Sequence, residues 1–592
     1  MLKAPSPRAL VLLACLLALF VALPFFVGPY GLKFATRLIV ISIFVVSLDF
    51  LLGLGGLVSF GHAAFFGVGA YAVYFISSDE GAANAFLALG AGVGLAAVCA
   101  LAIGAFACLT RGFYFIMVTL AAGQMMFSLF HDTDIAKGSD GAYINIKPDV
   151  TIAGHTLLDF DDRRSFFYVC LFFLIVALLA LFWLARTPFG RIVQGLKAND
   201  ARLSALGYDV YRAKLAAFVV SGAVAGLAGA LFACIDGFVT PDLFAWRQSG
   251  LAIMMVVLGG AGTLFGPILG ALAYISLEEA LKTASLVGDF VSAHWRLGTG
   301  LTLVIAVLLS PDGLAGFLRA APRVSRRTRA APSRPPAAAR KASTLATRTL
   351  SKTFGGLRAV DDVTVSFAPD LVHAIIGPNG AGKTTFTNLL SGALKPSAGE
   401  VLVDGKNVAG MPAHTIARRG VGRSFQRTNI FGAFTVEENC RLAAQAAHPA
   451  ILRFVDARRS EDDATIAYAL DVVGLSDRAD ALAGAMSNGE QRQLEIAMLI
   501  ASGGSILVLD EPLAGMGPEE TRRVVDLLRD LRRNHTIVLI EHDMDAVFAV
   551  ADTLTVLALG RLIAHGSPDE VRRNGEVISA YLGGHAPQEA GA

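Results

Sequence analysis

Ten apolar runs in the first half of the chain set the strongest limit on its fold. They lie near residues 9–28, 36–55, 62–77, 84–109, 113–130, 166–185, 213–235, 249–261, 264–281 and 298–312. A segment that crosses a hydrocarbon core of about 30 Å must satisfy its backbone N–H and C=O groups internally, and an α-helix does so. We therefore predict an all-α polytopic membrane domain of about ten spans over residues 1–318.

The charges between the runs predict an orientation. With the N-terminal Lys and Arg placed inside, as the positive-inside rule prefers, the acidic loop 131–165 falls outside and the basic stretches 186–214 and 319–341 fall inside. Lys33 and Arg37 are the exception, because the same orientation places them outside. The first run also fits a signal peptide, but its length and the lack of a small-residue cleavage site favour a retained span.

Three glycine-rich segments interrupt or line these runs. We expect "GGAGTLFGP" to be a hinge between two separate spans, 249–261 and 264–281, and Ser221 to Leu231 to be a close-packing helix face. The stretch from Gly53 to Ala72 and the "GGAGTLFGP" segment each fit either close packing or an interrupted helix that lines a substrate path. Asp49 and His62 lie inside apolar runs, where a functional role and a hydrogen-bonded structural role both remain open.

The stretch "RTPFGRIVQGLKANDARLSALGYDVYRAK", residues 186–214, is charged and lies between two spans. Each Asp, Lys or Arg would cost roughly 2.5–3.5 kcal/mol at the bilayer centre, so the stretch lies in water. It is nevertheless rich in helix formers and ends in Gly207, a good helix C-cap. An ordered helix between two spans predicts that something docks on it.

Composition separates the two halves of the chain. The hydrophobic fraction is 54% and the charged fraction is 17%, and the apolar excess lies before residue 319. Residues 319–342 form a basic Pro-, Ala- and Arg-rich linker, and residues 343–592 have the composition of a soluble domain. The net charge of +2 does not indicate nucleic acid binding, and six cysteines without a CxxC pair do not indicate a disulfide or metal framework.

The second half carries a phosphate-binding loop. "HAIIGPNGAGKTTFTNLL" matches G-x-x-x-x-G-K-[ST] between an apolar strand pattern and a helical pattern. Glycines let successive N–H groups point into one concavity, Lys383 reaches the β- and γ-phosphates, and Thr384 offers a hydroxyl to Mg²⁺. The predicted nucleotide-binding residues of this loop are Gly377, Pro378, Asn379, Gly380, Ala381, Gly382, Lys383, Thr384 and Thr385.

A second motif, "SILVLDEP", lies about 125 residues further on. Its apolar strand delivers Asp510 to the Mg²⁺ shell, and Glu511 follows directly. A carboxylate in that place can orient or deprotonate the attacking water, so we predict that Glu511 is catalytic. The fold class is therefore an α-helical membrane domain followed by an α/β P-loop NTPase domain.

Residues 343–584 resemble the ATP-binding cassettes of ABC proteins. "AMSNGEQRQLEIAMLIA" resembles their signature motif, "VGRSFQRTNIFGAFTVEEN" their glutamine loop and "IVLIEHDMDAV" their switch region. Two positions depart from the family, since Glu490 replaces the usual signature glutamine and Gly517 replaces a common aspartate. The resemblance implies an adenine-stacking Phe354, a nucleotide- and Mg²⁺-contacting Gln426, a catalytic His542, and nucleotide contacts from Ser487, Asn488, Gly489 and Glu490.

The membrane half resembles the permeases of branched-chain amino acid importers. "LDFLLGLGGLVSFGHAAFFGVGAYA" and "VVLGGAGTLFGPILGA" carry this resemblance, and the "KTFGGLRAVDDV" of the cassette resembles one of the ATPases of that system. In ABC importers a short cytoplasmic helix docks on the ATPase, and "GLKANDARLSALGYD" resembles this coupling helix, near Lys197 to Leu206. The chain thus resembles a natural fusion of two subunits.

The resemblance implies ATP-driven uptake of branched-chain amino acids or related small polar solutes. The expected cofactors are ATP and Mg²⁺. The expected partners are a second permease and a second cassette subunit, or a second copy of the chain, and a periplasmic or surface solute-binding protein. The expected location is the bacterial inner membrane, with the ATPase domain in the cytoplasm. An ABC exporter half-transporter is the alternative, although exporters of that kind usually have six long spans.

Overall fold

The computed structural model describes residues 7–77, 82–152, 155–283, 294–318, 341–447, 459–514 and 516–582. The chain divides into two compact units. Leu2–Lys197 and Tyr211–Pro322 form a helical unit, whereas Ala198–Val210 joins Arg323–Ala592 in a second unit. Nearly all of the predicted linker, 319–342, lies outside the described residues. A short segment between two helices of the first unit therefore belongs to the compact body of the second.

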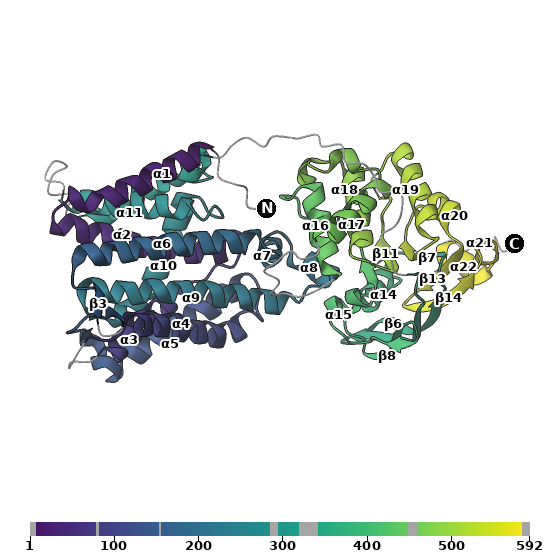
Figure 1. The fold of residues 1–592 in the computed structure, drawn as a ribbon. Helices are drawn as coiled ribbons and strands as arrows, with labels where there is room; N and C mark the ends of the chain where they lie inside the picture. The colour runs from purple at the N-terminus through teal and green to yellow at the C-terminus, as the bar shows by residue number, and fades with distance from the viewer. Residues whose placement is uncertain are drawn as a thin grey trace. The chain divides into compact units, whose positions relative to one another are not determined.

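The helical unit has a helix over each of the ten apolar runs (Figure 1). These helices are α1 (Pro7–Ala22), α2 (Pro29–Asp49), α3 (His62–Ile76), α4 (Ala85–Ala107), α5 (Phe113–His131), α6 (Arg163–Arg186), α9 (Val210–Asp236), α10 (Trp246–Gly259), α11 (Gly266–Thr283) and α13 (Trp295–Leu309). Among the described residues, six helices are long and apolar enough to cross a membrane. The unit is thus a helical membrane domain, in which six spans rather than ten stand out by length.

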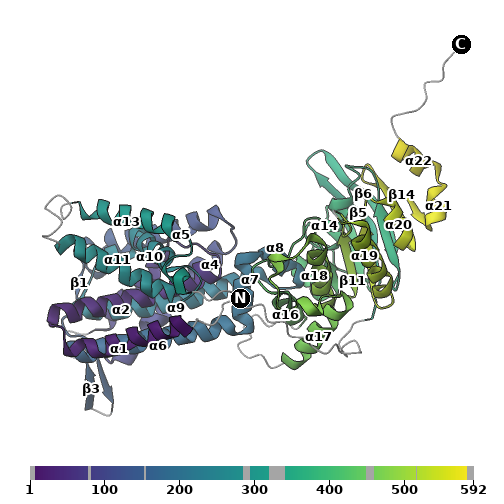
Figure 2. The ribbon, with the colours of Figure 1, turned by 90° about the horizontal axis from the view of Figure 1, so that it is seen from above.

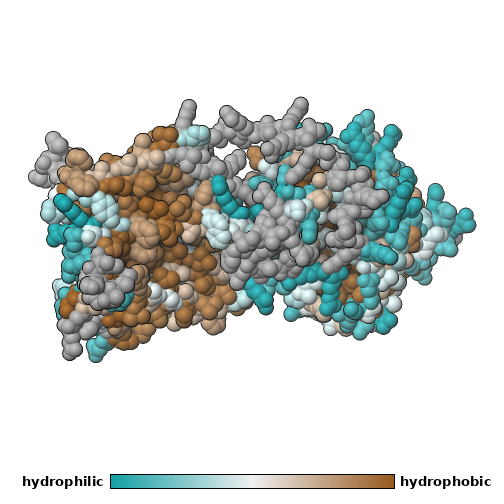
Figure 3. Space-filling model, viewed as in Figure 1, coloured by the Kyte–Doolittle hydropathy of each residue, from teal (hydrophilic) through white to brown (hydrophobic). Residues whose placement is uncertain are grey.

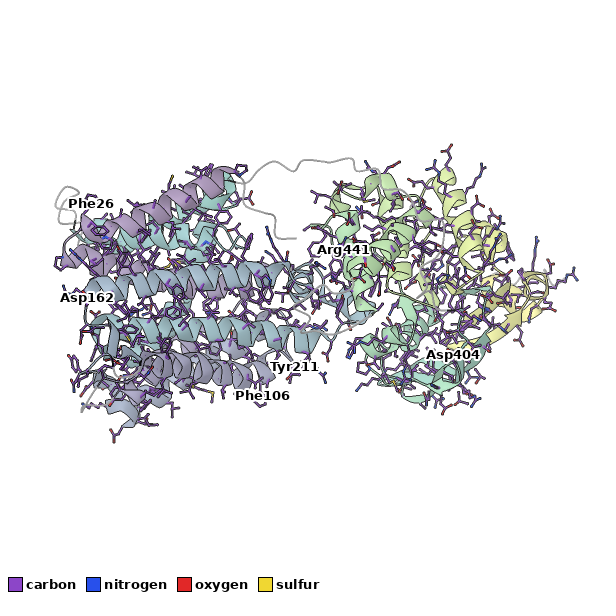
Figure 4. All side chains as sticks on the ribbon, in the orientation of Figure 1. Phe26, Phe106, Asp162, Tyr211, Asp404 and Arg441 are labelled. Carbon is purple, nitrogen blue, oxygen red and sulfur yellow. The ribbon has the colours of Figure 1, made fainter. Side chains whose placement is uncertain are left out.

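Short elements connect the long helices. They are η1 (Leu23–Phe25), η3 (Ile135–Asp140), α7 (Pro188–Ala198), η4 (Pro241–Phe244), η5 (Leu314–Leu318), and the strands β1 (Ala142–Tyr143), β2 (Asp149–Ile152), β3 (His155–Asp159) and β4 (Phe238–Val239). Strand β1 pairs with β4 and β2 pairs with β3, both antiparallel. The β2–β3 hairpin projects beyond the helices in Figure 2. It precedes Asp162, labelled in Figure 4, whose carboxylate caps α6 through the N–H groups of Arg164 and Ser165.

Glycines bring helices α3 and α9 close together in this unit. Helix α9 is continuous through Ser221 to Leu231, as expected for a packing face. A Cβ on Gly69 of α3 would lie 2.0 Å from the carbonyl oxygen of Gly226, and one on Gly229 would lie 1.8 Å from the carbonyl oxygen of Phe66. No side chain fits at these contacts, so the small residues set the separation of α3 and α9.

Two helix breaks occur where interruptions were considered. Helix α2 continues into a π-helical turn, η2 (Phe50–Leu54), and the chain then runs without a helix until α3 begins at His62. Helices α10 and α11 are separate, with Gly260 at φ +108° and Gly262 at φ +81° between them. Both glycine-rich segments therefore leave irregular backbone at the ends of helices.

The second unit contains two β-sheets. The mixed sheet has the order β10 (Val421–Arg423), β11 (Ile506–Asp510), β12 (Thr536–Ile540), β7 (Val372–Ile376), β13 (Thr553–Ala558) and β14 (Arg561–Gly566), and only β14 is antiparallel to its neighbour. The antiparallel sheet has the order β6 (Leu357–Phe367), β5 (Leu345–Phe354), β8 (Ala398–Val403) and β9 (Lys406–Asn407). Strands β7, β11 and β12 are buried at every residue, as their continuous apolar runs predict for a covered parallel sheet.

Helices complete this unit. They are α8 (Asp200–Leu206), α14 (Lys383–Leu390), α15 (Ala413–Arg418), α16 (Val436–Ala446), α17 (Arg459–Val472), α18 (Asn488–Ala501), α19 (Pro518–Leu531), α20 (Met544–Val550), α21 (Pro568–Arg572) and α22 (Gly575–Leu582), with short turns η6 (Ser476–Arg478) and η7 (Ala483–Ala485). Arg441 on α16, labelled in Figure 4, pairs with Glu437 at 2.6 Å and with Asp463 of α17 at 2.7 Å. The pair with Asp463 joins α16 to α17, whereas the pair with Glu437 lies within α16.

The surfaces of the two units differ in hydropathy. Figure 3 shows apolar side chains gathered over the visible face of the helical unit and hydrophilic side chains over much of the other. Phe106, labelled in Figure 4, is 73% exposed on α4. An exposed apolar belt of this kind fits a hydrocarbon environment, so the first unit is the membrane part of a multi-pass protein.

Candidate functional site

The phosphate-binding loop lies between β7 and α14, as the motif predicts. Gly377 has φ +153° and Gly382 has φ +92°, and a Cβ on either would lie within 2.2 Å of a backbone carbonyl oxygen. The Lys383 ammonium donates hydrogen bonds to the carbonyl oxygens of Gly377 at 2.6 Å and of Pro378 at 3.0 Å. Burial lowers the pKa of Lys383, while Glu511 and Asp510 act in the opposite direction. The loop therefore holds its cation over a concave run of backbone.

Asp510 ends the buried strand β11 and is 3% exposed. Its backbone N–H donates to the Ser424 hydroxyl at 3.0 Å, and the Arg423 guanidinium lies 3.9 Å from its carboxylate. Burial raises the pKa of Asp510, and Arg423 opposes this rise. Arg423 was not recognised from the sequence as part of this site, because no motif position marks it.

Two predicted residues, Gln426 and His542, contact the carboxylate of a third, Glu511. The Gln426 amide donates to both carboxylate oxygens at 3.2 Å, and His542 Nε2 lies 2.9 Å from Glu511 Oε1. Glu511 has φ +49°, an unusual backbone conformation for a residue with a side chain. Its N–H donates to the Ile540 carbonyl at 2.9 Å, which ties this turn to the neighbouring strand β12.

Glu541 supports this turn and was missed from the sequence. It is 4% exposed and accepts hydrogen bonds from the N–H groups of Leu513 at 2.7 Å and His542 at 3.2 Å. Burial raises the pKa of Glu541. The sequence "EHD" identified His542 through its resemblance to the switch region, but it gave no indication of a role for Glu541. Glu541 contacts the turn after β11 only because it follows β12, the strand that pairs with β11.

The signature residues cap helix α18. The Ser487 hydroxyl accepts the N–H of Glu490 at 3.2 Å, and the Glu490 carboxylate accepts the N–H of Ser487 at 3.0 Å. Glu490 also pairs with Arg478 at 3.0 Å. Burial acts to raise the pKa of Glu490, but Arg478 and Ser487 bring it below its usual value. The departure at Glu490 thus completes a capping box, which orders the helix N-terminus.

Two sets of predicted residues are not joined to the loop by a described contact. Among the described residues, no hydrogen bond or ion pair connects Ser487, Asn488 or Gly489 with the phosphate-binding loop. Phe354, at the end of β5, is 47% exposed, and the Lys352 ammonium lies 5.1 Å from its ring centroid. Ser487 and Asn488 are exposed at the start of α18, whereas Gly489 is buried.

The charged stretch between α7 and α9 packs within the second unit. Helix α8 begins at Asp200, so the prediction that the helix starts near Lys197 is wrong. Lys197 belongs to α7 and donates to the Gly53 carbonyl at 2.8 Å, while the Asn199 side chain caps α8. Asn199 separates the two helices. Its side chain accepts the N–H of Arg202 as an N-cap, and an N-cap residue has extended rather than helical backbone angles.

Helix α8 is bound by apolar and polar contacts. Leu203 is fully buried and Leu206 is 4% exposed, as predicted for the anchor residues. The Arg418 side chain donates to the Gly207 carbonyl at 2.8 Å, and the Tyr208 hydroxyl donates to the Leu442 carbonyl at 2.7 Å. The segment thus contacts both α15 and α16.

Arg202 lies at the centre of this contact and is fully buried. Its guanidinium donates to the Arg423 carbonyl at 3.0 Å, to Glu495 Oε1 at 3.3 Å and to the Glu495 carbonyl at 3.3 Å. Glu495 lies on the signature helix α18 and accepts the N–H of Phe425 at 3.1 Å. Sequence reasoning treated Arg202 as one of several solvated charges and missed it.

Glu495 connects helix α8 to the glutamine loop. Arg492 pairs with Glu495 at 3.1 Å and donates to the carbonyl of Phe425 at 2.6 Å and to that of Gln426. A continuous set of hydrogen bonds therefore runs from Arg202 through Glu495 and Arg492 to the carbonyl oxygen of Gln426, whose side chain donates to Glu511. Burial raises the pKa of Glu495, and Arg202 and Arg492 oppose this rise.

The two intramembrane polar residues are buried in the helical unit. The Asp49 carboxylate accepts the N–H of Gly262 at 2.6 Å and of Leu264 at 2.8 Å, so it holds the α10–α11 hinge against the end of α2. His62 Nε2 lies 2.9 Å from the Ser47 hydroxyl. The structure thus gives Asp49 a hydrogen-bonded role at a helix end, one of the two roles left open.

Comparisons with known proteins agree with both halves. Residues 30–308 match a family model described as "Branched-chain amino acid transport system / permease component", residues 360–514 match "ABC transporter", and residues 561–587 match "Branched-chain amino acid ATP-binding cassette transporter".

Individual relatives match the second half. The chain is 40% identical over 239 residues to the high-affinity branched-chain amino acid transport ATP-binding protein LivG of Escherichia coli K12, which covers 39% of this chain and 94% of LivG. It is 41% identical over 244 residues to BraF of Pseudomonas aeruginosa, with coverages of 40% and 95%. A solved nucleotide-free ATP-binding cassette from an ABC transporter is 28% identical, with a TM-score of 0.37 and coverages of 41% and 99%.

Proposed function

Because the chain belongs to the branched-chain amino acid ABC transporter family and joins its permease to its ATP-binding cassette, we propose that it drives uptake of branched-chain amino acids or related small polar solutes. The cassette is an ATPase coupled to transport. The observation that carries the proposal is the burial of Arg202, Leu203 and Leu206, from a segment between two membrane helices, in the compact body of the cassette. The branched-chain amino acid transport relatives support this substrate class.

We infer that the loop from Gly377 to Thr385 binds the phosphates of ATP. Its positive-φ glycines leave room where a Cβ would collide with backbone, and Lys383 supplies the cation. Phe354 offers an exposed ring for the adenine, and the capped N-terminus of α18, with Ser487, Asn488, Gly489 and Glu490, offers N–H groups to a phosphate on a second cassette.

Glu511 is proposed as the general base for the attacking water, with Gln426 and His542 orienting its carboxylate. Mg²⁺ would be held by Thr384, Asp510 and Gln426. Bound Mg²⁺ would neutralise charge that develops on the phosphates.

We propose that a second cassette completes the nucleotide site. Among the described residues of one cassette, no contact joins the phosphate-binding loop to the signature helix, and this observation supports the proposal. We propose a second permease and a second cassette subunit, or a second copy of this chain, together with a periplasmic or surface solute-binding protein.

We propose that all ten apolar runs are membrane spans, with domains at 1–318 and 343–592 joined by the linker 319–342. The protein would then lie in a bacterial inner membrane with its cassette in the cytoplasm. Two observations support this proposal. A helix lies over each of the ten runs. Lys33 is an exception to the positive-inside pattern, and its ammonium forms an ion pair with Asp236.

The test is transport by the complete complex in sealed vesicles with its binding protein. We expect ATP in the cassette-side compartment to drive labelled leucine, isoleucine or valine toward that side, and no transport with a non-hydrolysable ATP analogue. ATP-driven movement only in the opposite direction would contradict uptake, and transport of none of these amino acids would contradict the substrate class.

A further inference from the structure

A cleft in the helical unit combines charged and apolar walls. It lies between α2, α3, α10 and α11, and its empty space, with the open mouth included, is about 720 Å³. Its charged lining residues are Arg37, Glu278, Glu279 and Lys282. Arg37 lies on a helix that is long and apolar enough to cross a membrane, and ionisable groups within membrane spans are rare and usually functional, so this residue needs a role.

The charges of the cleft balance but are not all paired. Lys282 lies 2.5 Å from Glu278 and 4.2 Å from the Trp295 ring centroid, and Glu279 accepts the Tyr30 hydroxyl. Within the part of the chain that the structure describes, Arg37 has no carboxylate at ion-pair distance. Two cations and two carboxylates favour a ligand with no net charge and separated poles.

The inner wall of the cleft is apolar. Ile41, Phe44, Phe66, Leu251 and Met255 line it, and the rings of Phe44 and Phe66 are 4.8 Å apart. Phe44 and Phe66 are each 3% exposed, so they close the floor. An apolar floor beneath a charged mouth suits an aliphatic side chain attached to a charged head group.

The cleft lies toward one end of the unit. Arg37 precedes Asp49 by twelve residues on α2, which is about 18 Å along a helix. Lys197, which contacts Gly53 near the Asp49 end, leads directly into α8. Arg37 therefore lies in the half of α2 that is away from the contact between Gly53 and Lys197.

We propose that this cleft is the outward-facing substrate subsite of the permease and that it takes a zwitterionic aliphatic amino acid. Arg37 binds the carboxylate by a charge-assisted, two-pronged contact, Glu278 and Glu279 bind the ammonium, and the apolar floor binds the side chain. The inference rests on the proposed uptake function, to which it adds a site.

The experiment measures binding of labelled leucine to the complete purified complex without its solute-binding protein, so that the permease alone sets selectivity. Competitors are leucinamide, which lacks the carboxylate, and 4-methylpentanoate, which lacks the ammonium. The variants are Arg37→Gln and Glu278→Gln. The matched control is Lys33→Gln, one turn earlier on α2, whose ammonium pairs with Asp236.

We expect Arg37→Gln to weaken leucine binding at least about tenfold and to remove the preference for leucine over leucinamide. Glu278→Gln should reduce the preference over 4-methylpentanoate, and Lys33→Gln should stay within about twofold of wild type. Each preference is the ratio of two affinities measured on the same preparation, one for leucine and one for its competitor. The amount of correctly assembled protein therefore does not affect it.

Unchanged leucine binding and selectivity in Arg37→Gln would overturn the site, as would the absence of saturable leucine binding to the wild-type complex. ATP-driven leucine uptake by the wild type alongside either result would show that the transport function stands without this site. Failure of the wild type to transport any aliphatic amino acid would instead refute the proposed function.

Discussion

Replacing Arg202 with Met should uncouple ATP hydrolysis from transport. Arg202 is the buried cation that joins α8 to the signature helix, and Met keeps the length and apolar stem of the side chain while it removes the guanidinium. The lost hydrogen bonds reach the Glu495 carboxylate and two backbone carbonyls. Among the described residues, no hydrogen bond or ion pair joins Arg202 to the phosphate-binding loop.

The magnitude follows from what remains around Glu495. Removing one partner of a buried ion pair costs about 3–5 kcal/mol when the other charge is left alone. Here Arg492 and the Phe425 N–H still bind Glu495, so the loss is closer to the 1.5–3 kcal/mol of hydrogen bonds to charged groups. A cost of about 2–3 kcal/mol weakens docking of α8 by about 30- to 150-fold.

The assay compares ATP hydrolysis with amino acid uptake in vesicles that contain the complete complex. We expect Arg202→Met to retain ATP binding and to lose most uptake per ATP hydrolysed. Arg212→Met is the control, because it makes the same chemical change at an exposed position on α9.

A double-mutant cycle with Glu495→Gln should show that the two changes are not additive, since each breaks the same contact. Wild-type uptake per ATP in Arg202→Met would refute the reasoning, because transmission would then bypass this contact.

Three further outcomes are expected. Glu511→Gln should bind ATP but hydrolyse it at least ~100-fold more slowly, since a general base contributes 10²–10⁴; near-normal turnover of the purified complex would exclude the base role. Leu203→Asp combined with Leu206→Asp should preserve membrane insertion and ATP binding but abolish uptake, because each buried Leu contributes about 1.5–3 kcal/mol to docking; uptake at the wild-type rate would rule out α8 as the transmission point. The isolated chain, held as a proven monomer, should be inactive as an ATPase, and full activity in that state would contradict a site shared between two cassettes.

Local motifs were predictable from the sequence because neighbouring residues set their geometry. The phosphate-binding loop needs glycines at fixed offsets, and Gly377 and Gly382 have the backbone angles that only such a residue adopts easily. The buried strand before Asp510 follows from a continuous apolar run, and the helices of the membrane unit follow from runs that cannot expose backbone to lipid.

Partners distant in the chain were not predictable in this way. Arg202 and Glu495 are separated by 293 positions, and a charged residue in a polar stretch has no local sign that it will be buried. The same holds for Glu541, whose carboxylate binds the turn after β11, and for Arg423 beside Asp510.

Sequence by itself therefore determined the two-part architecture, the nucleotide motifs and the apolar anchors of α8, because each depends on spacing within a few helical turns or one loop. Tertiary structure alone decided which charges are buried, where α8 begins, how Asp49 holds the α10–α11 hinge and which groups share the cleft at Arg37. The physical reason is that burying a charge is favourable only when a partner is present, and the fold, not the local pattern, brings that partner into place.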